Sequence, residues 1–258
     1  MQKTKKIVVA NWKMNPQTAE AARAIFLGIR RVAEKLKRTE VVVCPPFVYI
    51  HALSKLVSSP KIKIGGQDVF WETSGSFTGE ISSSMLSSAE VGYVIVGHSE
   101  RRAIGETNEM VSKKVLAALR EGLKVILCIG EKTRDNQGDY LAFLKDQMLA
   151  SLSGVQKRHL LDLIVAYEPV WAIGKSEQDA LSGSGMHEMV IFIRKILSDV
   201  YGRDFAAGVP VLYGGSVAPS NTENIVREGM VDGLLVGRQS LEPKSFSEIL
   251  NIVDLVSQ

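Results

Sequence analysis

The chain has few of the residues that stabilise a protein lacking a large core. It contains only two cysteines, Cys44 and Cys128, and both lie in apolar runs, "VVVCPP" and "VILCIG". Buried free thiols are therefore favoured over a disulfide, which indicates a reducing compartment, with the cytoplasm as the default. A chain of 258 residues buries about 70–75% of its unfolded surface, so it needs neither a disulfide nor a metal for stability.

Other absences exclude whole classes of protein. The four histidines lack the spacing of metal ligands, so no metal site is expected. The basic residues near the start are not followed by an apolar run long enough for a signal peptide or a membrane span. The net charge of +3 is small, and no basic run interleaves with aromatics, which argues against nucleic-acid binding. A small anionic substrate is compatible with this charge.

What the sequence does contain is a repeated alternation of short apolar runs and amphipathic stretches. The runs are apolar on both faces, as buried parallel strands are. They cover residues 7–10, 41–44, 62–65, 93–96, 125–129, 163–167, 209–213 and 234–236. The clearest helical stretches are 18–36, 109–121, 140–152, 188–201 and 246–255. Thr18 is a suitable N-cap for the first of these helices.

Strands that alternate with helices predict a parallel sheet covered by helices. Eight such units fit a closed (β/α)8 barrel, one domain over residues 1–258 with an outer ring of helices, better than an open doubly wound sheet. Periodicity alone leaves the open sheet as an alternative. In a barrel the active site is built at the carboxyl ends of the strands, so those ends carry the functional argument.

The first strand ends in "ANWKMN", where Val9, Asn11 and Lys13 alternate onto one face. If that face points into the barrel, Asn11 and Lys13 lie at its mouth, and the lysine offers a charge to an anion. Taken alone, "NWK" is more typical of a surface loop.

The fourth strand ends in "YVIVGHSERR". By alternation Val94, Val96 and His98 share a face, and Ser99 is expected to cap a short helix after His98. A helix N-terminus beside the ring disfavours its protonation, so His98 is expected to stay neutral and to donate a hydrogen bond. The alternative is a structural histidine bound to backbone groups.

The sixth strand, "LDLIVAYE", ends in Glu168, which shares a face with Ile164 and Ala166. A buried carboxylate is costly unless it is paired or used. Apolar surroundings are expected to raise its pKa, which suits a general base. The apolar residues 170–173, followed by Gly174, predict a flap that excludes water. An ordinary ion-paired glutamate before a loop is the alternative.

The last two strands end in the glycine-containing segments "LYGGSV" at 212–217 and "LLVGRQS" at 234–240. Glycine lets backbone N–H groups approach an anion closely. Because the loops after strands seven and eight often bind phosphate in barrels, the two segments predict a phosphate site, with tight turns as the alternative.

Together these segments resemble the triosephosphate isomerase family. "ANWKMN", "GHSERR", "AYEPVWAIG", "YGGSV" and "SFTGE" at 76–80 match motifs of that family, in its order, across the whole chain. The resemblance implies a TIM barrel that interconverts dihydroxyacetone phosphate and D-glyceraldehyde 3-phosphate through an enediolate, in glycolysis and gluconeogenesis. It also implies an isomerase without metal or cofactor.

The resemblance implies a catalytic role for four residues. Glu168 would move a proton between adjacent substrate carbons, and His98 would polarise the carbonyl. Lys13, assisted by Asn11, would stabilise the anionic substrate and the enediolate.

The resemblance also implies the binding contacts. The phosphate group would be held by Gly174, Ser216, Gly237 and the backbone N–H of Arg238. "SFTGE" is similar to the dimer loop of the family, so Thr78 would reach the active site of the partner subunit in a homodimer.

Two departures from the family pattern concern the loops. Gly174 is followed by Lys175, Ser176 and Glu177 in place of a glycine-containing hinge, and Gly237 is followed by Arg238 in place of a second glycine. Two other functions stay open, namely a different phosphate-binding barrel isomerase and a non-catalytic phosphometabolite-binding or adhesion protein on the same barrel.

Overall fold

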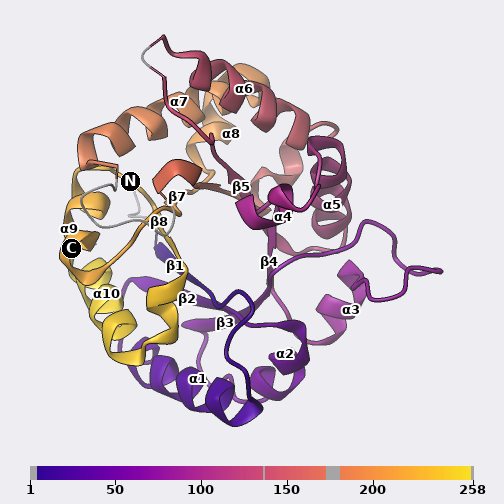
Figure 1. Ribbon diagram of the computed structural model, residues 1–258, viewed down its shortest axis with the longest axis vertical. Helices are drawn as coiled ribbons and strands as arrows, with labels where there is room; N and C mark the ends of the chain where they lie inside the picture. The colour runs from indigo at the N-terminus through magenta and orange to yellow at the C-terminus, as the bar shows by residue number, and fades with distance from the viewer. Residues whose placement is uncertain (1–4, 136, 173–180, 257–258) are drawn as a thin grey trace.

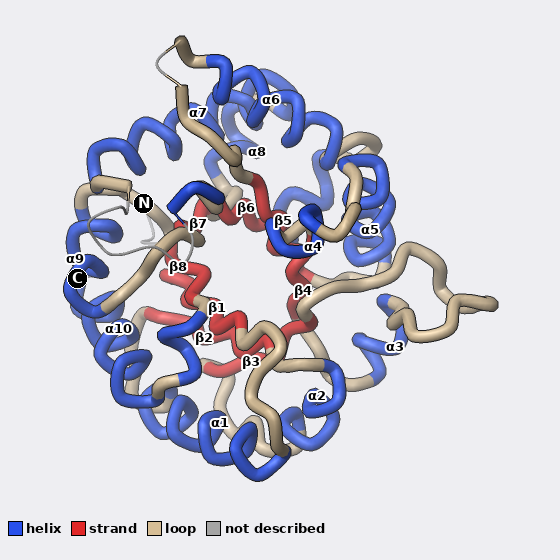
Figure 2. Tube along the Cα trace, viewed as in Figure 1, coloured by secondary structure: helices blue, strands red, loops and turns tan. Residues whose placement is uncertain are grey.

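The structure, a computed structural model, describes residues 5–135, 137–172 and 181–256. Its strands are β1 (Lys6–Asn11), β2 (Thr39–Cys44), β3 (Ile62–Gly66), β4 (Tyr93–Val96), β5 (Lys124–Ile129), β6 (Leu163–Tyr167), β7 (Val211–Tyr213) and β8 (Gly233–Val236). Each strand pairs in parallel with the next, and β8 pairs with β1, so the sheet closes into a barrel (Figure 2). The predicted (β/α)8 barrel is confirmed, and the closure excludes the open sheet.

Helices form a ring around the strands (Figure 1). The longer ones are α1 (Ala19–Ala33), α2 (Phe47–Ser54), α5 (Asn108–Arg120), α6 (Asp139–Ser151), α7 (Gly183–Tyr201), α9 (Pro219–Arg227) and α10 (Pro243–Val256). Short helical segments are α3 (Ser83–Ser88), α4 (Ser99–Ala103), α8 (Arg203–Ala207), η1 (Lys157–Asp162), η2 (Val170–Ala172) and η4 (Arg238–Leu241). The hydroxyl of Thr18 accepts the N–H of Ala21 over 3.2 Å, which confirms the predicted cap of α1.

Helix α7 begins earlier than the sequence predicts, at Gly183 rather than at residue 188. The hydroxyl of Ser182 accepts the N–H of Gly185 over 3.2 Å and so starts the helix within the glycine-containing stretch. Helix propensity disfavours glycine, and this cap outweighs the preference locally.

Apolar side chains fill two layers on either side of the strands. The layer inside the barrel consists of Val9, Val42, Cys44, Tyr93, Ile95, Ile126, Cys128, Ile164, Ala166, Leu212 and Leu235. The larger layer packs the outward-facing strand residues against the helices. Cys44 and Cys128 are both buried free thiols, as the sequence predicts. No helix in the described part of the chain is long and apolar enough to cross a membrane.

Closure of the barrel depends on a close approach between β8 and β1. Ile7 pairs with Gly233, and a Cβ atom on Gly233 would lie 1.8 Å from the carbonyl oxygen of Ile7. Real Cβ atoms do not come this close to an oxygen, so only glycine allows this pairing.

We predict that Gly233→Ala lowers the free energy of unfolding by about 3 kcal/mol, because the added methyl group forces β8 away from β1. Urea denaturation followed by circular dichroism measures the change. Gly92→Ala is the matched control, since a Cβ atom there meets nothing within 4 Å. Equal stability of the two variants would show that the β1–β8 contact tolerates a side chain.

Candidate active site

The carboxyl ends of β4 and β6 bring His98 and Glu168 together. Glu168 directly follows β6, whose Ile164 and Ala166 face the barrel interior as predicted. His98 Nε2 lies 3.1 Å from Glu168 Oε1, and the two side chains are only 7% and 3% exposed. The N–H of Ser99 donates to Glu168 Oε2 over 3.2 Å. Two donors therefore compensate for the burial of the carboxylate at the end of an apolar strand.

His98 reaches this position because Gly97 breaks the alternation of the strand. Val94 and Val96 lie in the outer core layer, whereas Ile95 faces the barrel interior. The expectation that His98 shares a face with Val94 and Val96 is therefore wrong. Gly97 has a φ of +71°, a left-handed conformation that glycine adopts without strain. This turn of the chain directs the next side chain toward the mouth of the barrel.

The N-cap of α4 is His98 and not Ser99, which corrects a second expectation. Nδ1 of His98 accepts the N–H of Glu100 over 3.2 Å, and the helix begins at Ser99 itself. Because Nδ1 accepts a hydrogen bond, the single hydrogen of a neutral ring lies on Nε2, facing Glu168. Ser99 lies in the first turn of α4, and its backbone N–H is the donor to Glu168.

The close contact changes the pKa of both groups. Burial raises the pKa of Glu168, but His98 and the Ser99 N–H outweigh it, and the pKa lies below its ordinary value of 4.5. The expected increase is wrong for this arrangement, because the strand pattern does not show the donors across the mouth. Burial lowers the pKa of His98, but the charge of Glu168 raises it above 6.5. While Glu168 stays in contact, it favours the protonated His98 ring and so opposes the neutral ring that the sequence predicts.

Lys13 lies at the same mouth in a strained backbone conformation. Its φ is +54°, which costs about 1–2 kcal/mol for a residue other than glycine. Asn11 is buried, and its Oδ1 accepts the N–H of Lys13 over 3.0 Å. Lys13 Nζ lies 2.6 Å from Glu100 Oε1, and Glu100 Oε2 lies 3.8 Å from His98 Nδ1. Glu100 thus links Lys13, which Asn11 holds, to His98, which contacts Glu168, so the predicted positions 11, 13, 98 and 168 lie together.

The segment after Glu168 is held by a residue that the sequence analysis missed. Glu131, 1% exposed, follows β5, and its Oε1 accepts both the Tyr167 hydroxyl and Trp171 Nε1 over 2.8 Å. Trp171 belongs to η2, so Glu131 fixes the start of the predicted flap. The sequence does contain a signal for Glu131, because a carboxylate ends the apolar run "VILCIGE" just as Glu168 ends the run "LDLIVAYE".

The residues expected to bind phosphate lie at the carboxyl ends of β7 and β8. Ser216 and Gly237 are half-buried, and Arg238 is exposed at the start of η4. A Cβ atom on Gly237 would lie 3.3 Å from Cε of Lys13, so the loop after β8 packs against the lysine. Gly174 and the three residues that follow it lie outside the described residues.

Thr78 lies on the loop between β3 and α3, which projects from the barrel (Figure 1). The neighbouring Phe77 is 43% exposed, and its ring centroid lies 4.6 Å from that of Phe70. An exposed aromatic side chain on a projecting loop is in keeping with a protein contact. The contact of Thr78 with a second subunit stays a prediction.

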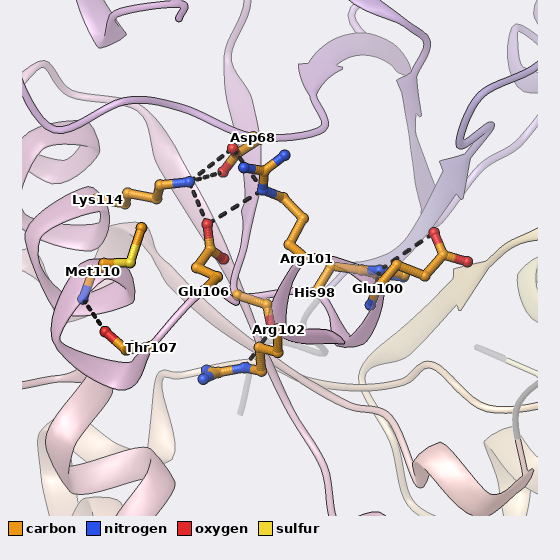
Figure 3. Close-up of polar contacts among 10 residues, drawn as sticks. Asp68, His98, Glu100, Arg101, Arg102, Glu106, Thr107, Met110 and Lys114 are labelled. Carbon is orange, nitrogen blue, oxygen red and sulfur yellow. Dashed lines mark hydrogen bonds and ion pairs between the residues drawn. The ribbon is translucent and has the colours of Figure 1, made fainter. Parts of the chain in front are cut away.

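A buried ion cluster lies beside α4 (Figure 3). Lys114 of α5, 1% exposed, contacts Glu106 and lies 2.8 Å from Asp68, which follows β3. Arg101 Nε of α4 lies 2.8 Å from Asp68 and 3.2 Å from Glu106. The cluster joins β3, α4 and α5, and so it fixes the short helix whose first N–H holds the catalytic candidate Glu168.

The pKa of His98 predicts a pH dependence of stability. The pKa of His98 is higher in the folded than in the unfolded state, where it is about 6.5, so protonation of His98 stabilises the fold. This stabilisation is complete below the pKa of the unfolded state and is lost as the pH rises through the pKa of the folded state. The loss of unfolding free energy caused by His98→Gln should therefore be larger near pH 6 than near pH 9. Urea denaturation across this range tests it, with the exposed His187→Gln as control. A difference that grows with pH would contradict the assigned direction.

Comparisons with known proteins give the family of the chain. The sequence profile of the family "Triosephosphate isomerase" matches residues 6–253. A triosephosphate isomerase of Dictyoglomus thermophilum is 40% identical over 248 residues, covering 95% of this chain and 98% of its own. One of Moorella thermoacetica is 42% identical over 247 residues, covering 95% and 97%, and one of a Roseiflexus species is 40% identical over 251 residues, covering 96% and 98%. The chain belongs to the triosephosphate isomerase family.

Proposed function

We propose that Glu168, His98, Lys13 and Asn11 carry out the interconversion of dihydroxyacetone phosphate and D-glyceraldehyde 3-phosphate in this chain. Family membership makes the chain an aldose–ketose isomerase. The observation that supports these residues is the 3.1 Å contact between His98 Nε2 and Glu168 Oε1 at the barrel mouth that Lys13 also lines. A buried acid–base pair beside a cation suits proton transfer on a small anionic substrate.

The proposed proton path uses two groups. Glu168 removes a proton from the substrate carbon that bears the hydroxyl group, and the electron pair moves onto the carbonyl oxygen to form an enediolate. His98 transfers its Nε2 proton to that oxygen and then takes up the proton of the other hydroxyl at Nε2, which leaves the negative charge on the second oxygen. Glu168 then returns its proton to the adjacent carbon, so the product is an isomer and both side chains recover their starting protonation.

In this proposal the substrate displaces Glu168 from its contacts with His98 and Ser99. His98 Nε2 and the Ser99 N–H both bind the carboxylate, and Nε2 cannot serve a substrate carbonyl while Glu168 occupies it. A Cβ atom on Gly214 would lie 2.8 Å from Cγ of Glu168, so glycine at this position provides the space beside the carboxylate stem. Once Glu168 moves away, burial, the charge of Lys13 and the N–H of Glu100 favour the neutral His98 that donates, against the carboxylate charge of Glu100.

Lys13 and Asn11 supply the positive electrostatic environment for the enediolate. Preorganised donors stabilise a developing anion without having to reorient during the reaction. The phosphate group would lie over the loops after β7 and β8, bound by Ser216, Gly237 and the N–H of Arg238, with Gly174 joining from the flap. The contact of Gly237 with Lys13 supports this placement, because it puts the phosphate loop next to the cation.

The whole of residues 1–258 would act as one catalytic domain and assemble as a homodimer in the cytoplasm, where it serves glycolysis and gluconeogenesis. The two buried free thiols support a reducing compartment. The projecting loop that carries Phe77 and Thr78 supports assembly through this part of the molecule.

We predict that Glu168→Gln lowers turnover on the order of 10²–10⁴-fold or more while the fold is kept, because the amide cannot accept the substrate proton. A coupled isomerase assay and circular dichroism measure the two properties. Glu109→Gln, at an exposed ion pair with Lys113 on α5, is the control for the loss of one carboxylate. Turnover of Glu168→Gln close to that of the control would remove Glu168 from the role of base.

We predict that Thr78→Arg shifts the protein from dimer toward monomer and lowers turnover, because a long charged side chain disrupts a close subunit contact. Sedimentation velocity over a range of protein concentrations measures the association. Thr133→Arg places the same charge on the exposed loop after β5 and should leave the association unchanged. A wild-type protein that sediments as a monomer, or a dimeric Thr78→Arg variant, would show that the interface is misplaced.

A further inference from the structure

The strained backbone of Lys13 is held on both sides. Asn11 Oδ1 accepts its N–H, as described above, and the side-chain amide of Gln67 binds its carbonyl oxygen. Gln67 Nε2 donates to the Lys13 carbonyl over 2.8 Å and to the Cys44 carbonyl over 2.9 Å. Neither the motifs nor the proton path assigns Gln67 a role. Its amide links the carboxyl ends of β1, β2 and β3.

The chemistry of a primary amide fits this position. Nε2 carries two hydrogens, so it can satisfy both carbonyl oxygens at once. The Cys44 carbonyl also accepts the N–H of Trp12 over 3.1 Å, which fixes the residue just before Lys13 to the same point. The polypeptide on either side of the strained φ is therefore bound to the end of β2.

Gln67 itself is attached to a rigid support. The next residue, Asp68, is 7% exposed and belongs to the ion cluster with Lys114 and Arg101 (Figure 3). Both Oδ atoms of Asp68 lie 2.8 Å from Lys114 Nζ. A side chain whose own backbone is anchored in this way can hold a neighbour in place with little freedom to drift.

We propose that Gln67 is a positioning residue that keeps Lys13 in its left-handed conformation and its ammonium group at the substrate. The inference rests on the proposed function, because it gives Gln67 a kinetic effect only through Lys13. Positive φ at a residue other than glycine persists only where the surroundings enforce it. Without the amide, the Lys13 carbonyl loses its donor and the backbone relaxes, which moves the side chain from its place beside Gly237 and Glu100.

A double-mutant cycle tests the proposal, with Gln67→Met, Lys13→Ala and the combined variant. Gln67→Met keeps the length of the side chain and removes both donors. It should lower kcat/KM on the order of 10- to 100-fold, through both a higher KM and a lower kcat, since small displacements of catalytic groups cost this much. In the Lys13→Ala background, Gln67→Met should lower kcat/KM by less than about twofold, because the effects of residues that act through one another are not additive.

Gln17→Met is the matched control, because the Gln17 amide also donates to a backbone carbonyl of this segment, that of Met14, over 3.2 Å on the surface. It should stay within about twofold of the wild-type kcat/KM. Gln67→Glu provides a second variant of nearly the same shape, and it should lower kcat/KM at least as much because an oxygen replaces the donor. Thermal unfolding of every variant shows whether the fold is kept.

The outcomes separate the two proposals. If Lys13→Ala leaves the kinetics unchanged, the proposed role of Lys13 is wrong, whatever Gln67 does. If Lys13→Ala is impaired but folded Gln67→Met and Gln67→Glu keep the wild-type kcat/KM, the positioning role is overturned. It is also overturned if Gln67→Met costs the same factor with and without Lys13, since Gln67 would then act by another route.

Discussion

Parallel closure of the sheet is the constraint from which the site follows. Because β8 pairs with β1 as well as with β7, all eight carboxyl ends lie on one rim, and residues 13, 98 and 168 meet although they are far apart in sequence. The closure leaves no room for a side chain at Gly233. It also buries both faces of every strand, so polar side chains with a function are confined to the rim.

The contact between Glu168 and His98 governs the protonation of the buried carboxylate. Held by His98 and the Ser99 N–H, the carboxylate has a lowered pKa and stays ionised at neutral pH. The same donors make it a weak base. In the proposed reaction a substrate oxygen would take the place of the carboxylate at His98, and burial without that hydrogen bond would raise the pKa of Glu168. The increase in pKa expected from the strand pattern is wrong for the described contacts, because it left out the two donors.

Much of this arrangement could be predicted from strand ends alone. Alternation along "LDLIVAYE" placed Glu168 inside the barrel, because no residue interrupts the strand. The same rule failed at His98, since the positive φ of Gly97 departs from the extended conformation and alternation holds only for extended backbone. The lowered pKa of Glu168 and the contacts of the Gln67 amide could not be predicted from one strand, because each depends on a group that another strand supplies. Glu131 was missed although its sequence signal matched that of Glu168.

The two ion pairs at the mouth differ in burial, and this difference suggests an order of events on binding. Glu100 is 57% exposed and pairs with Lys13 through solvent-screened contact, which is worth little and is easily displaced by an incoming anion. Glu168 and His98 are nearly fully buried, so their contact yields only to a group that replaces its hydrogen bonds. Under the proposed function, the phosphorylated triose would therefore take Lys13 from Glu100 first. Its carbonyl oxygen would then replace Glu168 at His98 and release the proposed base.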